Sequence, residues 1–367
     1  MKVVQVLPAL RGGGVEKGTL EVAQYLVDQG HESIVVSAGG QMVSQLEAEG
    51  SRHIAWDLGR KSVLTFRHVW AFRRFLKQEK PDILHLRSRM PAWVAWLAWR
   101  GLPKNQRPRL ITTVHGLYSV SGYSKIMCRG DVVIAVSDTV KAYIEANYPD
   151  TPKDCIRVIY RGVDAKEFPY QYQPPIEWCS RFYQEFPQLS GRKILCLPGR
   201  LTRLKGHHDF IDMIESLSKV RGDIVGLIVG GEDPKRVDYA NELYKRVERL
   251  GLSDKIIFTG ARTDIREIFS ISAIVYSLSN KPESFGRTVL EALRLGRPVV
   301  GYDHGGVGEI LQQIYPTGAV TLKDQDQLQA RSRALIDTDI DTESVVPESH
   351  LFTKQEMLRQ TLQVYES

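Results

Sequence analysis

Two basic side chains in the second half of the chain stand where they could hold an anion. Arg200 and Lys205 lie in a loop that follows a buried apolar run and precedes a helical segment. Two fixed cations there could neutralise the charge that grows on a departing nucleotide diphosphate, as a metal ion does in other enzymes. Basic residues in loops are usually only solvated, so this pattern alone does not decide the function.

Two glutamates further along the chain could bind hydroxyl groups. Seven residues separate Glu283 from Glu291, with Gly286 between them. The glycine would let the backbone approach a ligand, and a helix starting near Arg287 would direct free N–H groups at an anion. We expect Glu283 in the loop facing a sugar and Glu291 on the helix beside a ribose. Without the other motifs, this segment would be interpreted as two solvated glutamates at the start of a helix.

Short β-branched runs alternate with segments of helical period in both halves, which is the pattern of parallel α/β sheets. The expected strands are 3–7, 33–36, 82–86, 110–114 and 132–136, and then 193–197, 225–229, 255–258, 273–276 and 298–300. Ser137 with Asp138 is expected to cap the helix that follows the fifth strand. Ligands of such sheets sit beyond the carboxyl ends of the strands, so we expect the active site in a cleft between two doubly wound halves.

The boundaries follow from a proline- and glutamine-rich stretch at 169–175, where the alternation stops. The expected parts are an N-terminal Rossmann-like domain, a linker, a C-terminal Rossmann-like domain, and a C-terminal helix that packs back on the body. Their ranges are 1–170, 171–190, 191–348 and 349–367.

Composition fits a globular protein of two domains: 43% of the 367 residues are hydrophobic and 25% are charged. No stretch approaches the roughly 20 apolar residues of a membrane-spanning helix, so a cytoplasmic location is expected. The cysteines are unevenly spaced without paired CxxC units, which argues against zinc or a disulfide framework. They are expected to be buried thiols: Cys128, Cys155, Cys179 and Cys196.

The net charge of +6 is concentrated in the first half, where residues 1–170 hold 24 Lys and Arg against 16 Asp and Glu. Basic and aromatic residues share one expected helix, and three tryptophans follow it. They are Arg67, Arg73, Arg74, Lys77 and Lys80 with Phe66, Trp70 and Phe72, and then Trp93, Trp96 and Trp99. This composition suits the surface of an anionic membrane, on the cytoplasmic face of the inner membrane. A solvated helix packed by its aromatic side fits equally well, and no nucleic-acid module is present.

Taken in order, several segments resemble the family 4 retaining glycosyltransferases of the GT-B fold, and the likeness covers nearly the whole chain. They are Pro81-Asp82-Ile83-Leu84-His85, Thr113-Val114-His115-Gly116, Ala135-Val136-Ser137, Val158 to Asp164, the two loops above, and Gly305-Gly306-Val307-Gly308-Glu309-Ile310. Within the family the chain is most similar to bacterial enzymes of lipopolysaccharide core or envelope saccharide synthesis. The sequence departs from the family's usual motifs at Arg161, where many members have asparagine, and at Ser284, where glycine is frequent.

The resemblance implies retaining transfer of a sugar from a UDP-, GDP- or ADP-linked donor to a saccharide or glycolipid hydroxyl, with no metal or cofactor. It assigns the acceptor to the N-terminal domain, 1–170, and the nucleotide-sugar donor to the C-terminal domain, 191–348. It makes Arg200 and Lys205 ligands of the diphosphate, Glu283 a ligand of the transferred sugar and Glu291 a ligand of the ribose. His115 is expected near the reacting sugar. Backbone groups at the remaining positions would border the diphosphate and sugar: Gly13, Gly14, Phe285, Gly286, Arg287 and Thr288.

Three other interpretations remain open. Asp324-Gln325-Asp326 could hold manganese, but its place at an expected helix start favours an N-cap. Gly12-Gly13-Gly14 after the first strand could indicate a nicotinamide-dependent oxidoreductase, but it lacks the GxGxxG spacing, and no acidic residue ends the second strand. A catalytically inactive sugar-nucleotide scaffold would retain the same donor residues.

Overall fold

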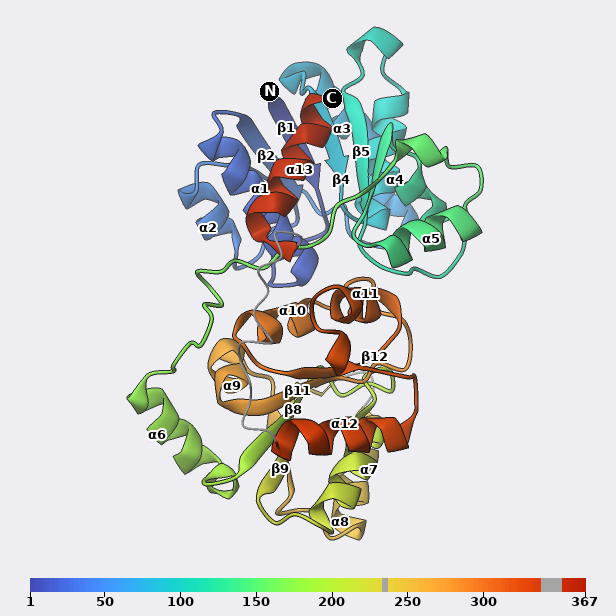
Figure 1. The fold of residues 1–367 in the computed structure, drawn as a ribbon. Coiled ribbons are helices and arrows are strands. Elements are labelled where there is room, and N and C mark those ends of the chain that lie inside the picture. Colours follow the sequence, from blue (N-terminus) through green and yellow to red (C-terminus); the bar gives the residue numbers. More distant parts are fainter. Residues whose placement is uncertain (233–236, 338–351) are drawn as a thin grey trace. The chain divides into compact units, whose positions relative to one another are not determined.

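The computed structural model describes residues 1–232, 237–337 and 352–367, which form two compact units (Figure 1). The N-terminal unit comprises Met1–Tyr160 with Gln355–Ser367, and the C-terminal unit comprises Arg161–Lys354. The stretch 171–190, expected as a linker, lies within the C-terminal unit and contains helix α6 (Ile176–Glu185). The expected boundary between 348 and 349 lies outside the described residues.

The N-terminal unit is built on a seven-stranded sheet whose neighbouring strands all pair in parallel, in the order β3-β2-β1-β4-β5-β6-β7. The strands are β1 (Lys2–Val6), β2 (Glu32–Ser37), β3 (Arg52–Ala55), β4 (Ile83–Leu86), β5 (Arg109–Val114), β6 (Val132–Ala135) and β7 (Ile156–Val158). The helices are α1 (Gly14–Asp28), α2 (Val43–Ala48), α3 (His68–Glu79), α4 (Arg89–Arg100), α5 (Asp138–Asn147) and α13 (Lys354–Glu366). Short 3₁₀ turns lie at η1 (Val63–Arg67), η2 (Lys104–Gln106), η3 (Ser124–Cys128) and η4 (Lys153–Cys155).

The C-terminal unit repeats this architecture with a six-stranded parallel sheet in the order β10-β9-β8-β11-β12-β13. Its strands are β8 (Lys193–Pro198), β9 (Ile224–Val229), β10 (Ile256–Gly260), β11 (Ser272–Ser277), β12 (Val299–Tyr302) and β13 (Ala319–Val320). Its helices are α6 (Ile176–Glu185), α7 (His207–Ser218), α8 (Val237–Arg249), α9 (Ile265–Ile271), α10 (Arg287–Arg294), α11 (Gly305–Ile314) and α12 (Gln325–Asp337), with turns η5 (Pro187–Leu189) and η6 (Pro316–Gly318).

These two sheets confirm the predicted fold class of paired Rossmann-like domains. In each sheet the strand order reverses beside the first strand, between β1 and β4 and between β8 and β11. Loops leave the carboxyl ends of neighbouring strands in opposite directions at such a switch point, which opens a crevice for ligands. The loops after β8 and β11 carry the basic pair and Glu283.

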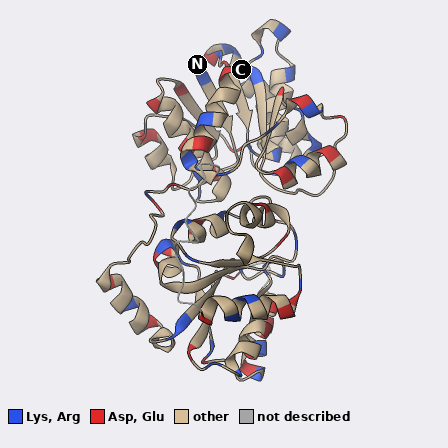
Figure 2. Ribbon diagram, viewed as in Figure 1, with Lys and Arg blue, Asp and Glu red and all other residues tan. Residues whose placement is uncertain are grey.

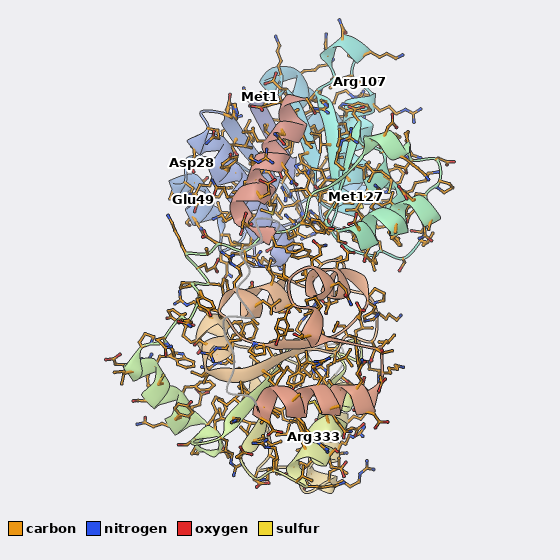
Figure 3. The ribbon with its side chains drawn as sticks, in the orientation of Figure 1. Met1, Asp28, Glu49, Arg107, Met127 and Arg333 are labelled. Carbon is orange, nitrogen blue, oxygen red and sulfur yellow. The ribbon has the colours of Figure 1, made fainter. Side chains whose placement is uncertain are left out.

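Both sheets are buried on two faces, which explains their nearly continuous apolar strands. In β1 and β9, for example, Val3, Val4, Ile224 and Val225 are fully buried. Met127 in η3, labelled in Figure 3, is likewise fully buried in the core of the N-terminal unit. All four cysteines are free thiols, as expected, but only Cys128 and Cys196 are buried, whereas Cys155 and Cys179 are partly exposed.

The chain's last helix, α13, packs on the N-terminal unit through polar contacts to two strands. Tyr365 Oη lies 2.6 Å from His85 Nδ1, and Arg109 donates to the carbonyl of Val364 at 2.6 Å. Ser137 caps α5 as predicted, accepting a hydrogen bond from the amide of Val140. Within the described residues, no helix is long and apolar enough to cross a membrane.

Candidate functional site

The loop after β8 is held in one shape by its contact with the loop after β11. Gly206, the N-cap of α7, has φ 71° and ψ 26°, a left-handed conformation that favours glycine. A Cβ at this position would lie 1.9 Å from the carbonyl oxygen of Leu278, so a side chain is also excluded by contact. The amide of Asn280 donates to the carbonyl of Leu204 at 2.8 Å, which joins the two loops beside Lys205.

Lys205 and Glu283 form an ion pair across these loops, with Nζ 2.7 Å from Oε1. The hydroxyl of Ser279 donates to the same carboxylate oxygen. Burial raises the pKa of Glu283, but the charge of Lys205 and the hydrogen bonds from Lys205 and Ser279 outweigh it and hold the pKa below its usual range. Glu283 is therefore ionised at neutral pH. Its side chain remains 26% exposed, so a ligand can reach it.

A glycine pair at the start of α11 supports the Glu283 loop from behind. The amide of Gly306 donates to the carbonyl of Glu283 at 2.8 Å. A Cβ at Gly306 would lie 2.3 Å from the backbone of Phe285, so the approach requires glycine. His304 Nε2 lies 2.7 Å from the carbonyl oxygen of Ser279, which fixes the other end of the loop.

Helix α10 begins directly after this loop, with Gly286 as its N-cap at φ 112°. Phe285 is buried against Phe352, so its side chain anchors the loop. Arg287 Nε donates to Glu291 Oε1 at 2.9 Å, and the Glu291 side chain is only 12% exposed. The ion pair fixes the rotamer of Glu291, leaving a carboxylate that can accept hydrogen bonds from hydroxyl groups.

A cavity of about 650 Å³ opens beside Glu291, within the usual range for small-molecule sites. Thr288 and Glu291 from α10 line it together with residues from the loops after β8 and β10 and from helices α6 and α9. These include Gly199, Asp264, Arg266, Glu267 and Trp178. A Cβ at Gly199 would lie 3.1 Å from Lys205 Cδ, so the stem of Lys205 runs past the cavity wall. The cavity thus lies next to the ion pair.

Arg200 stands near the start of the Lys205 loop and is exposed. The structure therefore assembles Lys205, Glu283, Gly286, Thr288 and Glu291 around two loops, one helix and a cavity. Arg200 shares the loop of Lys205 but makes no contact that ties it to the ion pair in the part of the chain described.

The other three predicted residues lie in the N-terminal unit. Gly13 is the N-cap of α1, and the carboxylate of Glu16 accepts hydrogen bonds from the amides of Arg11 at 2.6 Å, Gly12, and Gly13 at 2.9 Å. Gly14 has open space around it. His115 follows β5, is half-buried, and donates its amide to Tyr118 Oη at 3.3 Å. The glycine loop thus already holds a carboxylate of its own.

Asp324 caps α12, accepting a hydrogen bond from the amide of Gln327 at 2.9 Å. This contact agrees with the N-cap interpretation of the Asp-x-Asp pair. Among the described residues, no group of three or more His, Cys, Asp or Glu side chains could hold a metal ion.

Several site residues went unrecognised in the sequence. Ser279 and His304 have no distinguishing pattern, because their roles come from the contact of two loops. Trp178 was placed in the linker, but its Nε1 donates to Asp264 at 2.8 Å, which brings α6 to the cavity. The amphipathic period of 176–185 is the signal that could have indicated a packed helix there.

Comparisons with known proteins decide the family. Residues 12–167 match the model for Glycosyltransferase Family 4 and residues 181–347 match that for Glycosyl transferases group 1. A solved glycosyltransferase from Rickettsia africae is 30% identical, with a TM-score of 0.84 over 100% of this chain and 97% of that one. The chain belongs to the family 4 glycosyltransferases.

Two other relatives of this glycosyltransferase are informative. The lipopolysaccharide core biosynthesis mannosyltransferase LpsB of Rhizobium meliloti is 30% identical over 204 residues, which is 55% of this chain and 54% of LpsB. The match therefore spans about half the length of that relative. HepE of Anabaena, solved in complex with UDP-glucose, is 20% identical with a TM-score of 0.80 over 100% of this chain and 99% of that one, a likeness that shows the GT-B fold.

Replacing Gly306 with alanine tests the support of the Glu283 loop. We expect Gly306→Ala to lower the free energy of unfolding by roughly 1–3 kcal/mol, because its Cβ would overlap the backbone of Phe285. Urea unfolding measures this change. Gly222→Ala is the matched control, since nothing lies within 4 Å of a Cβ there. Equal stability of the two variants would show that the close approach does not constrain the loop.

Proposed function

We propose that this protein is a retaining, metal-independent glycosyltransferase that moves a sugar from a nucleotide-diphosphate sugar to a hydroxyl group. The observation that carries the proposal is the Lys205–Glu283 ion pair beside the cavity lined by Glu291. Lys205 offers a cation that could bind a diphosphate, while the carboxylates of Glu283 and Glu291 could accept hydrogen bonds from the sugar and the nucleoside. Family membership supports the same reaction class.

The donor would lie along the C-terminal unit, with its nucleoside in the cavity and its ribose hydroxyls on Glu291. The diphosphate would meet Lys205, Arg200 and the N-terminus of α10, since helix N-termini attract anions. A lysine ammonium carries three N–H donors, so Lys205 can bind Glu283 and a phosphate oxygen together. The transferred sugar would then reach Glu283. The complex of HepE with UDP-glucose supports a donor of this kind, and UDP-, GDP- and ADP-linked sugars are the candidates.

In the reaction, the bond from the sugar's anomeric carbon to the diphosphate oxygen breaks while the acceptor oxygen bonds to that carbon on the same face. The acceptor's hydroxyl proton passes to the departing phosphate oxygen, so no protein nucleophile is required. The enzyme supplies positioning and charge: Arg200 and Lys205 stabilise the anion that forms, and His115, Gly13 and Gly14 are expected to border the reacting groups.

The acceptor is inferred from a relative of the chain. The naming of LpsB as a lipopolysaccharide core mannosyltransferase favours a lipopolysaccharide core or another envelope saccharide or glycolipid as acceptor. Such an acceptor would bring the protein to the cytoplasmic face of the inner membrane, where the basic helix α3 would face anionic lipid. A catalytically inactive sugar-nucleotide scaffold is the competing function, because it would retain the same donor site.

The two glutamates should fail differently. Glu291→Ala should mainly raise KM, because it removes a contact to the part of the donor that stays the same during the reaction. Glu283→Ala should lower kcat while nucleoside diphosphate still binds, since the sugar changes charge and shape in the transition state. Losing a charge-assisted hydrogen bond of roughly 1.5–3 kcal/mol corresponds to about a ten- to hundredfold effect. Steady-state transfer and calorimetric binding measure the two effects.

Glu242→Ala provides the matched control for these variants. Glu242 is also a paired glutamate of the C-terminal unit, with Arg203 and His208 as partners, but it does not line the cavity. Its loss should leave transfer near the wild-type level. If Glu283→Ala and Glu291→Ala also kept that level with an intact circular dichroism spectrum, the donor-site assignment would be wrong. Donor binding without any transfer by the wild type would favour the scaffold.

Activity should need no divalent metal, because two cationic side chains and a helix terminus already serve the diphosphate. Transfer assayed after EDTA treatment should match that of the untreated enzyme. Magnesium or manganese added back should change the rate little. A loss of transfer that manganese restores would contradict the proposed mechanism. It would favour manganese binding by Asp324 and Asp326.

A further inference from the structure

Large apolar side chains are exposed on one short segment of the N-terminal unit, turn η1 and the first residues of α3. The exposed fractions are 83% for Val63, 69% for Leu64 and 74% for Trp70, and Phe66 is 37% exposed. Burial of Val63, Leu64 and Trp70 therefore contributes little to the fold, whereas Phe66 is buried in part. We call Val63, Leu64, Phe66 and Trp70 the apolar tip.

The backbone beneath the apolar tip has a defined shape. Ser62 caps the turn by accepting a hydrogen bond from the amide of Leu64 at 3.2 Å, and Thr65 Oγ1 donates to the carbonyl of Arg60 at 2.9 Å. The opposite side of α3 packs on the core through buried Phe72 and Leu76. Since the segment is fixed on one side, its apolar residues point outward from a folded platform.

Exposed cations flank the apolar tip in the sequence. Arg60, Lys61, Arg67, Arg74 and Lys77 are all exposed. Asp57 and Glu79 are the acidic residues between 57 and 80; Asp57 pairs with Arg60 at 2.6 Å, and Glu79 with Arg52 at 2.6 Å. Lys and Arg, blue in Figure 2, occur on both units, but here they adjoin exposed apolar side chains.

Arg73, one of the predicted membrane-facing cations, has a different role. Its guanidinium lies over the Trp70 ring, 4.7 Å from the centroid, and its Nε donates to the carbonyl of Ala98 at 3.4 Å. The contact with Trp70 favours one position of the indole ring. Arg73 therefore links the exposed Trp70 ring to the backbone of α4, and the exposed cations of this segment are Arg67, Arg74 and Lys77.

We infer that the apolar tip inserts into the interfacial region of an anionic lipid bilayer, while Arg67, Arg74 and Lys77 contact the lipid headgroups. This inference rests on the membrane contact in the proposed function and names the residues that make it. A bilayer surface accepts apolar side chains and cations together, and tryptophan favours the interface. A solvated face would not need four large apolar residues, and a second copy would bring like charges together.

Vesicle sedimentation tests the inference, using phosphatidylcholine vesicles with and without phosphatidylglycerol. The wild type should bind the vesicles that contain phosphatidylglycerol. The double variant Leu64→Ser/Trp70→Ser should bind them at least about tenfold more weakly, since two apolar side chains no longer leave water. Arg74→Glu/Lys77→Glu should lose binding at low salt. Val220→Ser is the matched control, because Val220 is 66% exposed on the C-terminal unit and its loss should change nothing.

A depth measurement distinguishes insertion from surface attraction. Lipids brominated in their acyl chains should quench part of the wild-type tryptophan fluorescence, and Trp70→Phe should remove this quenching while the protein still binds the vesicles. Calorimetric binding of nucleoside diphosphates should be the same for the wild type and all these variants. That readout reports the donor site separately from the lipid contact.

Three other outcomes would contradict the inference. Vesicle binding that is unchanged in Leu64→Ser/Trp70→Ser, without quenching of Trp70, would leave only electrostatic contact and refute insertion. Absence of wild-type binding to any vesicle would refute both insertion and the proposed membrane contact. Self-association of the wild type that Leu64→Ser/Trp70→Ser abolishes, again without vesicle binding, would assign the apolar tip to a second copy of the chain.

Discussion

The ion pair between Lys205 and Glu283 joins two loops that leave neighbouring strands of the C-terminal sheet in opposite directions. A carboxylate and an ammonium group lose hydration free energy when they are partly buried. Keeping them 2.7 Å apart therefore requires a backbone that fixes their geometry. The contacts of Gly206 and Gly306 provide that rigidity by bringing backbone within reach where no side chain fits. Removing either partner would leave the other charge poorly compensated, which makes both the shape and the chemistry of the site depend on this pair.

The charged residues of the candidate site differ in how far the protein itself pairs them. Glu291 is tied to Arg287 and faces the cavity, Glu283 is tied to Lys205, and Arg200 is exposed in solvent. A diphosphate bound here could therefore contact Arg200, which is exposed, and Lys205, which is ion-paired but still partly exposed. In the N-terminal unit the glycine loop differs, because Glu16 already occupies its amides. An anion that used those amides would have to displace the carboxylate.

Much of this architecture could be predicted from the sequence, for physical reasons. Central parallel strands are buried on both faces, so their apolar runs are continuous and the strands at 3–7 and 225–229 were recognisable. The edge strands β3 and β7 were missed, since Arg52–Ala55 and Ile156–Val158 are short and partly exposed. Lys205, Glu283 and Glu291 were predicted as donor residues from spacing and resemblance, and the structure pairs Lys205 with Glu283 and lines a cavity with Glu291. Ser279, Trp178 and Glu16 were not, because their contacts join segments whose pairing a linear pattern does not encode.

The most direct measurement of the donor site is a crystal structure of the protein with the nucleoside diphosphate that most raises its melting temperature. Our account predicts density for the nucleoside in the cavity lined by Gly199 and Glu291, with ribose hydroxyls on Glu291 and the diphosphate at Lys205. A nucleotide bound instead at the glycine loop before α1, or in a position that leaves Glu291 and Lys205 without contact, would contradict it.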